Sequence, residues 1–236
     1  MNNSNYNAWP VGRLQKKWQR PEIDMLKESG YEFDDAREVV DIFEKKIAEY
    51  SGSKYAVSVD SCTNSLFLCL MYLKKFKKCP DVITIPKRTY ISVPMSIIRA
   101  GFKVEFKDRK WVGLYKLEPT NIYDSAVRFT KDMYVQDSLQ CLSFQIKKHL
   151  PIGKGGMILT NDKHAYDWLK IASYEGRHVN VPYDEDKVEF VGWNNYMTPE
   201  DAARGIILFD QLPKCNRDLV KCDHYTDISK QMVFHD

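Results

Sequence analysis

The sequence predicts a three-layer α/β/α fold in which a mainly parallel sheet lies between helices. Two observations predict it. From residue 55 onward, short apolar segments of strand length alternate with longer helical patterns, and several helical patterns carry the residues typical of helix starts and ends. Strands that alternate with helices are typical of βαβ units, whose strands run parallel. With 236 residues, the chain can bury a substantial core.

The first predicted helix follows Asp34 and Asp35, which are suited to cap its start, and it ends at Gly52. Its apolar positions recur at the spacing of one helix face. They are Val39, Val40, Phe43, Ile47 and Tyr50. Strands are predicted at 55–59, 82–85, 103–106, 121–123, 140–144 and 156–160, and helices at 64–76, 94–100, 162–174 and 198–212.

The last two predicted helices have clear boundary signals. Asn161 or Asp162 can cap the first of them, which stops at Gly176. Thr198 can cap the second, and Pro199 then occupies the first helical position, where proline is well tolerated.

Three parts of the chain are expected. Residues 1–33 are polar and irregular and are predicted to form an N-terminal arm that lies over the body. Residues 34–212 form the α/β domain. Residues 213–236 are polar, lack a clear core face and form a short C-terminal segment.

The composition limits the classes of partner. With 35 basic and 32 acidic residues, the net charge of +3 is too balanced to indicate a nucleic-acid partner. No run approaches the length of a membrane span, and the N-terminus lacks the features of a secretory signal, so we expect no membrane partner and a cytoplasmic location. The six cysteines include no Cys-x-x-Cys pair, and no His, Cys and carboxylate grouping has zinc-site spacing, so we expect free thiols and no metal.

The segment from Ser143 to Gly156 is the most informative. Lys147 and Lys148 follow a predicted strand directly, and Gly155 and Gly156 open the next one. A lysine just past a strand end lies where α/β proteins collect their ligands. For a lone lysine, a solvated basic loop is the simpler interpretation.

Three other segments place polar or aromatic residues after predicted strands. They contain Asp124, the run Ser61–Leu66 and Tyr90. The amides at the start of a helix, together with its dipole, can bind a phosphate. Each segment also has a simpler interpretation: an aspartate that caps the next turn, an ordinary helix N-cap, and a core tyrosine.

Together these segments resemble the DegT/DnrJ/EryC1/StrS sugar aminotransferases, which use pyridoxal phosphate. The lysine segment resembles their pattern of Ser-Phe, three residues, Lys, and Gly-Gly seven and eight positions later. Counted from Ser143, that register selects Lys148. The chain resembles a shortened member of this family.

Four more segments are similar to the family. Phe43–Gly52 is close to its Phe-Glu helix, Ser61–Leu66 to its Ser-Gly-Thr-x-Ala-Leu turn, and Asp124–Ala126 to its Asp-Ala-Ala segment. Gly192–Met197 resembles its Gly-x-Asn-Tyr-Arg-Met segment. The sequence departs from the family at five positions. Cys62 replaces a usual glycine, Tyr196 an arginine, Val127 a histidine or glutamine, His149 an asparagine and Lys154 a glutamate.

The resemblance implies a type I pyridoxal-phosphate fold and pyridoxal 5'-phosphate as cofactor. Lys148 would hold the cofactor as a Schiff base, and Asp124 would keep the pyridine nitrogen protonated. Both are the implied catalytic residues.

The resemblance also implies how the cofactor is bound. Thr63 and Asn64 would donate main-chain bonds to its phosphate, Ser143 would add a hydroxyl, and Tyr90 would stack on its ring. Asn194 would reach toward the phosphate of a partner subunit, which implies a homodimer.

The implied activity is transfer of an amino group to a keto sugar, nucleotide-linked, with glutamate as the amino donor. Two alternatives stay open. Family dehydratases carry histidine at the lysine position, and His149 is adjacent to Lys148. The other alternative is a catalytically reduced binding or partner subunit. It is favoured because the connection at 107–120 is too short for the family's usual strands and helix, and because the small C-terminal domain is nearly absent.

Overall fold

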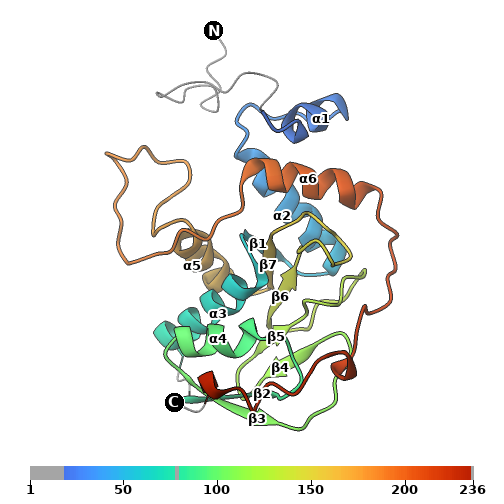
Figure 1. Ribbon diagram of the computed structural model, residues 1–236. Helices are drawn as coiled ribbons and strands as arrows, with labels where there is room; N and C mark the ends of the chain where they lie inside the picture. Colours follow the sequence, from blue (N-terminus) through green and yellow to red (C-terminus); the bar gives the residue numbers. More distant parts are fainter. Residues whose placement is uncertain (1–18, 78–79, 235–236) are drawn as a thin grey trace.

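A five-stranded sheet with the order β1-β7-β6-β5-β4 forms the centre of the structure, a computed structural model that describes residues 19–77 and 80–234 (Figure 1). Its strands are β1 (Tyr55–Val59), β4 (Tyr115–Leu117), β5 (Ile122–Asp124), β6 (Leu139–Ser143) and β7 (Gly156–Thr160). A second sheet pairs β2 (Val82–Pro86) with β3 (Lys103–Lys107). Reciprocal backbone hydrogen bonds of 2.8 and 3.0 Å between Thr84 and Glu118 join the two sheets at the β2 and β4 edges.

The central sheet is mixed rather than mainly parallel, which corrects the prediction. Among the described strands, β1 and β7, β6 and β7, and β4 and β5 pair antiparallel, whereas β5 and β6 pair parallel. The reason lies in the connections. Residues 118–121 alone join β4 to β5, and the 144–155 connection between β6 and β7 contains no helix. A parallel crossover needs a dozen or more residues and usually a helix.

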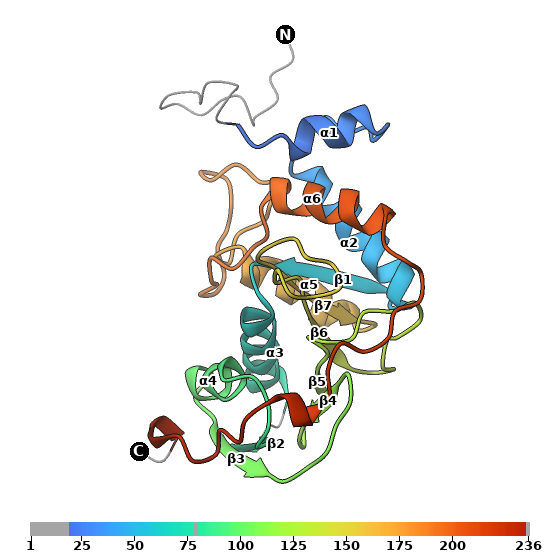
Figure 2. The same cartoon turned by 45° about the vertical axis from the view of Figure 1, so that its right-hand side comes forward.

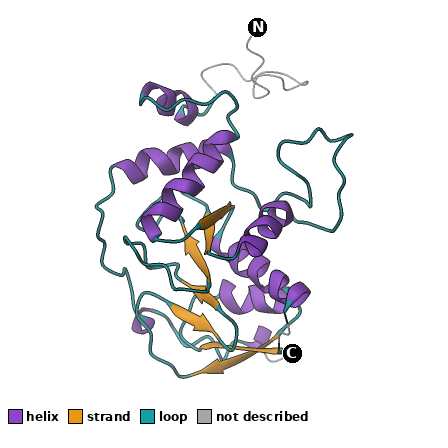
Figure 3. Cartoon of the chain, turned by 180° about the vertical axis from the view of Figure 1, so that it is seen from behind, coloured by secondary structure: helices purple, strands orange, loops and turns teal. Residues whose placement is uncertain are grey.

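Helices cover both faces of the sheet and give three layers (Figures 2 and 3). On one face lie α3 (Cys62–Phe76) and α5 (Lys163–Ser173), with α4 (Ser92–Arg99) against α3. On the other face lies α2 (Glu38–Ser51), followed outward by α6 (Pro199–Asp210) and α1 (Glu22–Glu28). The three-layer architecture expected from the sequence is therefore present.

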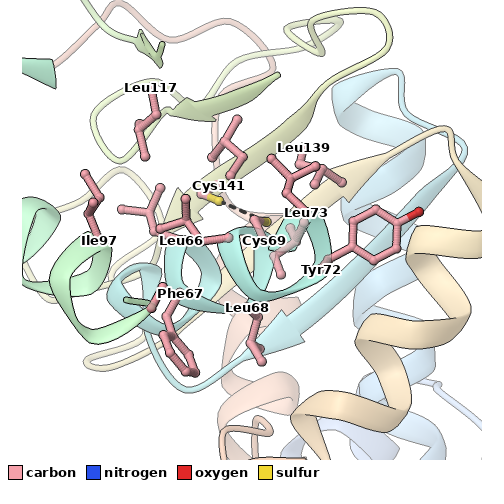
Figure 4. Packing of buried hydrophobic residues seen from close by; sticks show 14 of the residues in the cluster. Leu66, Phe67, Leu68, Cys69, Tyr72, Leu73, Ile97, Leu117, Leu139 and Cys141 are labelled. Atoms are coloured by element: carbon pink, nitrogen blue, oxygen red, sulfur yellow. Dashed lines mark hydrogen bonds between the residues drawn. The ribbon is translucent and has the colours of Figure 1, made fainter. Parts of the chain in front are cut away.

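The strands divide their side chains between two cores because successive residues of a strand point to opposite faces. In β7, Ile158 lies in the core on the α3 side, whereas Met157 and Leu159 lie in the core on the α2 side. Figure 4 shows the α3-side core, where Cys69 and Cys141 meet with their Sγ atoms 3.7 Å apart. Among the described residues, all cysteines are free thiols.

Two of the predicted helix starts are confirmed. The carboxylate of Asp162 accepts hydrogen bonds from the amides of His164 and Ala165 at the start of α5. Thr198 accepts from the amide of Asp201 at the start of α6, with Pro199 as the first residue.

Two other predictions need correction in detail. Helix α2 begins at Glu38, three residues after Asp35, so its boundary lies later than predicted. Asp35 still acts at this helix start: its Oδ1 accepts from the Arg37 amide at 2.9 Å, and its own amide donates to Oε1 of Glu38 at 3.1 Å. The predicted irregular arm contains α1, whose Leu26 is fully buried beside α6. Ile23 packs against the same core, and Arg20 reaches Asp201 of α6 at 2.8 Å. The rest of the predicted arm, residues 1–18, lies outside the described residues, as do residues 78–79 and 235–236.

No helix within 19–77 and 80–234 is both long enough and apolar enough to cross a membrane.

A buried ion pair joins α2, β1 and α5. Lys170 Nζ lies 2.8 Å from Oε2 of Glu44 and 3.0 Å from Oδ1 of Asp41. The other oxygen of Glu44 accepts hydrogen bonds from the amide and hydroxyl of Ser58. Burial raises the pKa of Glu44, and Lys170 is the main opposing influence. Glu44 is thus a buried carboxylate that depends on Lys170.

We predict that Lys170→Met lowers the free energy of unfolding by about 3–5 kcal/mol at neutral pH, because the buried Glu44 charge loses its partner. The loss should be smaller in acid. Since the pKa of folded Glu44 lies above its usual value, the folded variant keeps a proton that the unfolded chain releases, and its stability falls as pH rises through that window.

Denaturant unfolding at several pH values measures both effects. Lys163→Met is the matched control because its ion pair with Asp167 is solvent-exposed, and it should cost less than about 1 kcal/mol. Equal costs for the two variants, or a Lys170→Met cost independent of pH, would contradict the prediction.

Candidate active site

A cavity of about 640 Å³ opens where β5 and β6 end and α3 begins. Five of the seven residues predicted for the site line it: Ser143, Lys148, Thr63, Tyr90 and Asp124. These five residues come from separate stretches of the sequence, and the fold brings them together at one cavity.

Lys147 and Lys148 both line the cavity, where Lys148 is half-buried and Lys147 is exposed. Burial raises the pKa values of Asp124 and of Cys62, and the positive charge of Lys148 opposes both rises. The Lys148 amide donates to the carbonyl of Gln145 at 2.8 Å, which closes the turn after β6. The register that selects Lys148 stays a prediction.

The two glycines of the lysine segment allow a close approach to α3. A Cβ atom on Gly156 would lie 2.4 Å from the backbone nitrogen of Cys62. Gly155 has a φ of +147° and bridges to Ser61, a conformation that side chains with a Cβ rarely adopt. Lys154, between the lysine pair and the glycines, reaches Asp60 with its Nζ 3.2 Å from Oδ2. The lysine loop, residues 144–155 between β6 and β7, is therefore held against the start of α3.

Helix α3 begins with Ser61, whose hydroxyl accepts a hydrogen bond from the amide of Asn64 at 3.2 Å. Among the described residues, no acceptor pairs with the amide of Thr63. The Asn64 side chain is turned away, donating to Asp60 and accepting from Arg99. Of the two predicted phosphate donors, Thr63 lines the cavity and Asn64 does not.

Asp124, at the end of β5, is 6% exposed and fully satisfied on both oxygens. Oδ1 accepts from the amide of Ala126 at 2.9 Å, and Oδ2 accepts from the hydroxyl of Tyr115 at 2.5 Å. Burial raises the pKa of Asp124 above its usual value, while Tyr115, Ala126 and Lys148 oppose the rise.

Tyr90 is 61% exposed and stands at the mouth of the cavity, so it is no core tyrosine. Tyr225 lines the same cavity, and its pKa is raised to about 12, chiefly by burial and then by the charge of Asp124. The ring of Tyr225 also lies 5.5 Å from that of Trp111, centroid to centroid.

Sequence analysis missed the C-terminal segment as part of this site. The segment, red in Figure 1, runs alongside β4 and ends near β2 and β3. It contributes to the cavity lining with Leu219, Val220, His224 and Tyr225. Its polar sequence shows no periodicity, and it is held by backbone hydrogen bonds together with the isolated buried side chains of Cys222 and Ile228. The amides of Leu219, Cys222 and Ile228 donate to the carbonyls of Val127, Trp111 and Lys87.

Two residues singled out in the sequence lie outside the cavity lining. Asn194 donates through Nδ2 to Oε1 of Glu175 at 2.7 Å within its own loop. His149 has Nε2 at 2.8 Å from the carbonyl oxygen of Arg217. Lys148, and not His149, is thus the residue of this pair that faces the cavity.

Comparison with known proteins identifies the family. The sequence model of the DegT/DnrJ/EryC1/StrS aminotransferase family matches residues 27–133 and 131–227. The chain therefore belongs to this family. Its membership implies pyridoxal phosphate as the cofactor.

One curated relative is the spore coat polysaccharide biosynthesis protein SpsC of Bacillus subtilis (strain 168). It is 27% identical over 177 residues, which cover 57% of this chain and 45% of SpsC.

Solved structures confirm the type I fold. AtS13 from Actinomadura melliaura superposes with a TM-score of 0.65 at 18% identity, over 80% of this chain and 64% of that one. Helicobacter pylori PseC, an aminotransferase involved in pseudoaminic acid biosynthesis, gives 0.60 at 15% identity, over 73% and 57%. GDP-4-keto-6-deoxymannose-3-dehydratase (ColD) gives 0.62 at 20% identity, over 85% and 68%. The chain spans less than half of SpsC and under two thirds of AtS13 and PseC.

The residues present fit the implied cofactor. A phosphate needs amide donors at a helix start, and the Thr63 amide is available there. A pyridine nitrogen needs a buried acid, and Asp124 supplies one at the cavity. A covalent link needs a lysine within the same space, and Lys148 lines it. Cys62 stands where the family has glycine, but its side chain leaves the cavity open.

We predict that Arg128→Gln loosens the C-terminal wall of the cavity. Arg128 binds Asp218 through two parallel hydrogen bonds of 2.8 and 2.7 Å, and such bidentate pairs are among the stronger polar contacts. The amides of Leu219 and Cys222 should exchange with solvent roughly tenfold faster, as expected for the loss of a hydrogen bond between charged groups.

Hydrogen exchange read by mass spectrometry measures this effect. Lys131→Gln is the control, because its contact with Asp132 is exposed and long at 3.9 Å. Unchanged exchange at both amides in Arg128→Gln would show that the backbone bonds alone hold the segment.

Proposed function

We propose that this chain is a pyridoxal-phosphate-dependent aminotransferase that acts on a keto sugar linked to a nucleotide, with glutamate as the amino donor. The observation that carries the proposal is the meeting of Lys148, Asp124 and the free Thr63 amide at one cavity. The relatives support the substrate class, since SpsC and PseC are named for polysaccharide and pseudoaminic acid biosynthesis. A cytoplasmic location is part of the same proposal.

Each residue has a distinct task in this proposal. When bound, pyridoxal phosphate supplies a sink for the electron pair left on the substrate carbon after deprotonation. Lys148 would hold the cofactor through Nζ and would serve as the base that moves the proton of the substrate carbon. Asp124 would keep the ring nitrogen protonated. Thr63 and Ser143 would bind the phosphate, and Tyr90 would stack on the ring. Asn64, whose amide donates to the capping hydroxyl of Ser61, would contribute by shaping that helix start.

Sugar dehydration is the second candidate, favoured by the similarity to ColD. It would require a histidine in the place of the catalytic lysine. Lys148 lines the cavity, while the ring of His149 is engaged with the Arg217 carbonyl. This arrangement favours amino transfer over dehydration.

A reduced binding subunit is the third candidate, favoured by the share of SpsC that the chain spans. The lining of the cavity by Lys148 and Asp124 weighs against it, because a mere binding subunit has no need of either group.

We predict that the purified chain, mixed with pyridoxal phosphate, gains visible absorbance and that Lys148→Ala abolishes it, because the covalent link forms at this amine. Borohydride reduction and peptide mapping should label Lys148. Amino transfer from glutamate to a nucleotide-linked keto sugar should likewise be lost.

Lys147→Ala is the matched control, since Lys147 is the exposed neighbour on the same loop and should leave the absorbance unchanged. A label on Lys147 or Lys154 would overturn the assignment. Absorbance without amino transfer would favour dehydration, and no absorbance in the unaltered chain would favour the binding subunit.

We predict a homodimer in which Asn194 of one subunit completes the cavity of the other. Asn194 does not line its own cavity, and it lies with Glu175 on the surface. Two-fold assemblies are the commonest kind. Asn194→Ala should weaken retention of pyridoxal phosphate by roughly tenfold, the loss of one hydrogen bond to a charged group, without changing the unfolding temperature.

Equilibrium dialysis across a dilution series, together with sedimentation, tests the shared site. Asn121→Ala is the control, because Asn121 bonds to the Asp137 carbonyl far from the cavity lining. A monomer that keeps full cofactor occupancy would refute the shared site.

A further inference from the structure

The hairpin of β4 and β5 places a tyrosine directly opposite Asp124. In the antiparallel register, Tyr115 pairs with Asp124 and Lys116 pairs with Tyr123. Directly opposed residues of an antiparallel pair project to the same face of the sheet. Tyr115 and Asp124 are both buried, and both line the cavity.

The hydrogen bonds around Tyr115 have a determined direction. An ionised carboxylate only accepts, so the Tyr115 hydroxyl donates its one hydrogen to Oδ2 of Asp124. The Thr89 hydroxyl lies within bonding distance of the same oxygen of Tyr115 and must therefore donate to it. The result is a directed chain from Thr89 through Tyr115 to Asp124.

The hairpin that carries Tyr115 is fixed in place by its neighbours. The indole nitrogen of Trp111 donates to the Arg88 carbonyl at 2.9 Å, and its ring lies 4.9 Å from that of Tyr115. Thr89 follows Arg88 directly in the sequence. The donor of the chain and the strand that carries Tyr115 are thus tied to the same short segment.

We propose that Tyr115 is a positioning residue that fixes the carboxylate of Asp124 at the cavity and keeps it ionised there. The assignment of the ring nitrogen as the group that Asp124 faces rests on the proposed function, whereas the action of Tyr115 on Asp124 does not.

The need for such a residue follows from the burial of Asp124. Burial raises the pKa of this carboxyl, and the Tyr115 bond is the largest opposing influence, ahead of the Ala126 amide and the charge of Lys148. The other titratable groups that face Asp124 are Cys62 on α3, Cys141 on β6 and Tyr225 in the C-terminal segment. Because their pKa values are raised, these three groups are neutral at ordinary pH. They therefore do not stabilise the ionised form of Asp124.

The test compares Tyr115→Phe with Tyr123→Phe in the full chain without cofactor. Tyr123 is the neighbour of Asp124 on β5 and projects to the opposite face of the sheet. Tyr123→Phe removes the same hydroxyl group at a position that does not face Asp124, and it is therefore the matched control. Carbon NMR of labelled aspartate carboxyls, with Asp124 assigned by its loss in Asp124→Asn, gives the pKa of Asp124 directly.

We expect Tyr115→Phe to raise the pKa of Asp124 by about one unit or more, since a hydrogen bond to a charged group is lost. Tyr123→Phe should leave it unchanged. Thr89→Val should raise it by less, because Thr89 acts through Tyr115. This second variant keeps the test decisive if Tyr115→Phe does not fold.

An unchanged pKa in Tyr115→Phe, or an equal rise in Tyr123→Phe, would overturn the proposal. Failure of the proposed function is a separate result. If the unaltered chain gains no visible absorbance with pyridoxal phosphate, the cofactor assignment fails, while the NMR comparison still decides whether Tyr115 governs Asp124.

Discussion

The backbone of Gly155 and Gly156 lies directly against the start of α3, and the arrangement of the site depends on this approach. Any side chain at Gly156 would collide with the backbone of Ser61 and Cys62. The approach brings two loops that are more than 80 residues apart in sequence into contact, one with Lys148 and the other with the Thr63 amide. The pair of Lys154 and Asp60 adds an ionic link between the same loops. A lysine and a helix start are each common features, and here the fold brings Lys148 and the start of α3 to one cavity.

The short connection between β4 and β5 determines both the direction of β4 and the environment of Asp124. Four residues can only form a hairpin, so β4 runs antiparallel to its neighbour. The same hairpin sets Tyr115 across from Asp124. The buried carboxylate therefore receives its hydroxyl donor from the strand next to its own.

Much of the fold could be predicted from local patterns, and the limits have physical causes. Strands β1 and β7 and the start of α6 carry strong signals in apolar runs, glycines and a Thr-Pro cap, and they agree with the structure. Strand direction could not be predicted from alternation, because direction depends on connection length and pairing. β4 has three residues, too few for a periodic signal. Lys148 and Asp124 are implied by the resemblance to the family, whereas Tyr115 matches no motif and is identified only by its register opposite Asp124.

The C-terminal segment forms one wall of the cavity. Backbone hydrogen bonds join it to Val127, Trp111 and Lys87, and Arg128 pairs with Asp218. Its buried side chains, Cys222 and Ile228, are spaced too irregularly to give an apolar pattern in the sequence. The side chains of His224 and Tyr225 line the cavity. Burial, and then the charge of Asp124, raise the pKa of Tyr225. The segment therefore lies near this carboxylate as well as along the cavity. The cavity is consequently enclosed by several separate parts of one chain: the lysine loop, the start of α3, this segment, and residues within 89–93, 111–115 and 124–127.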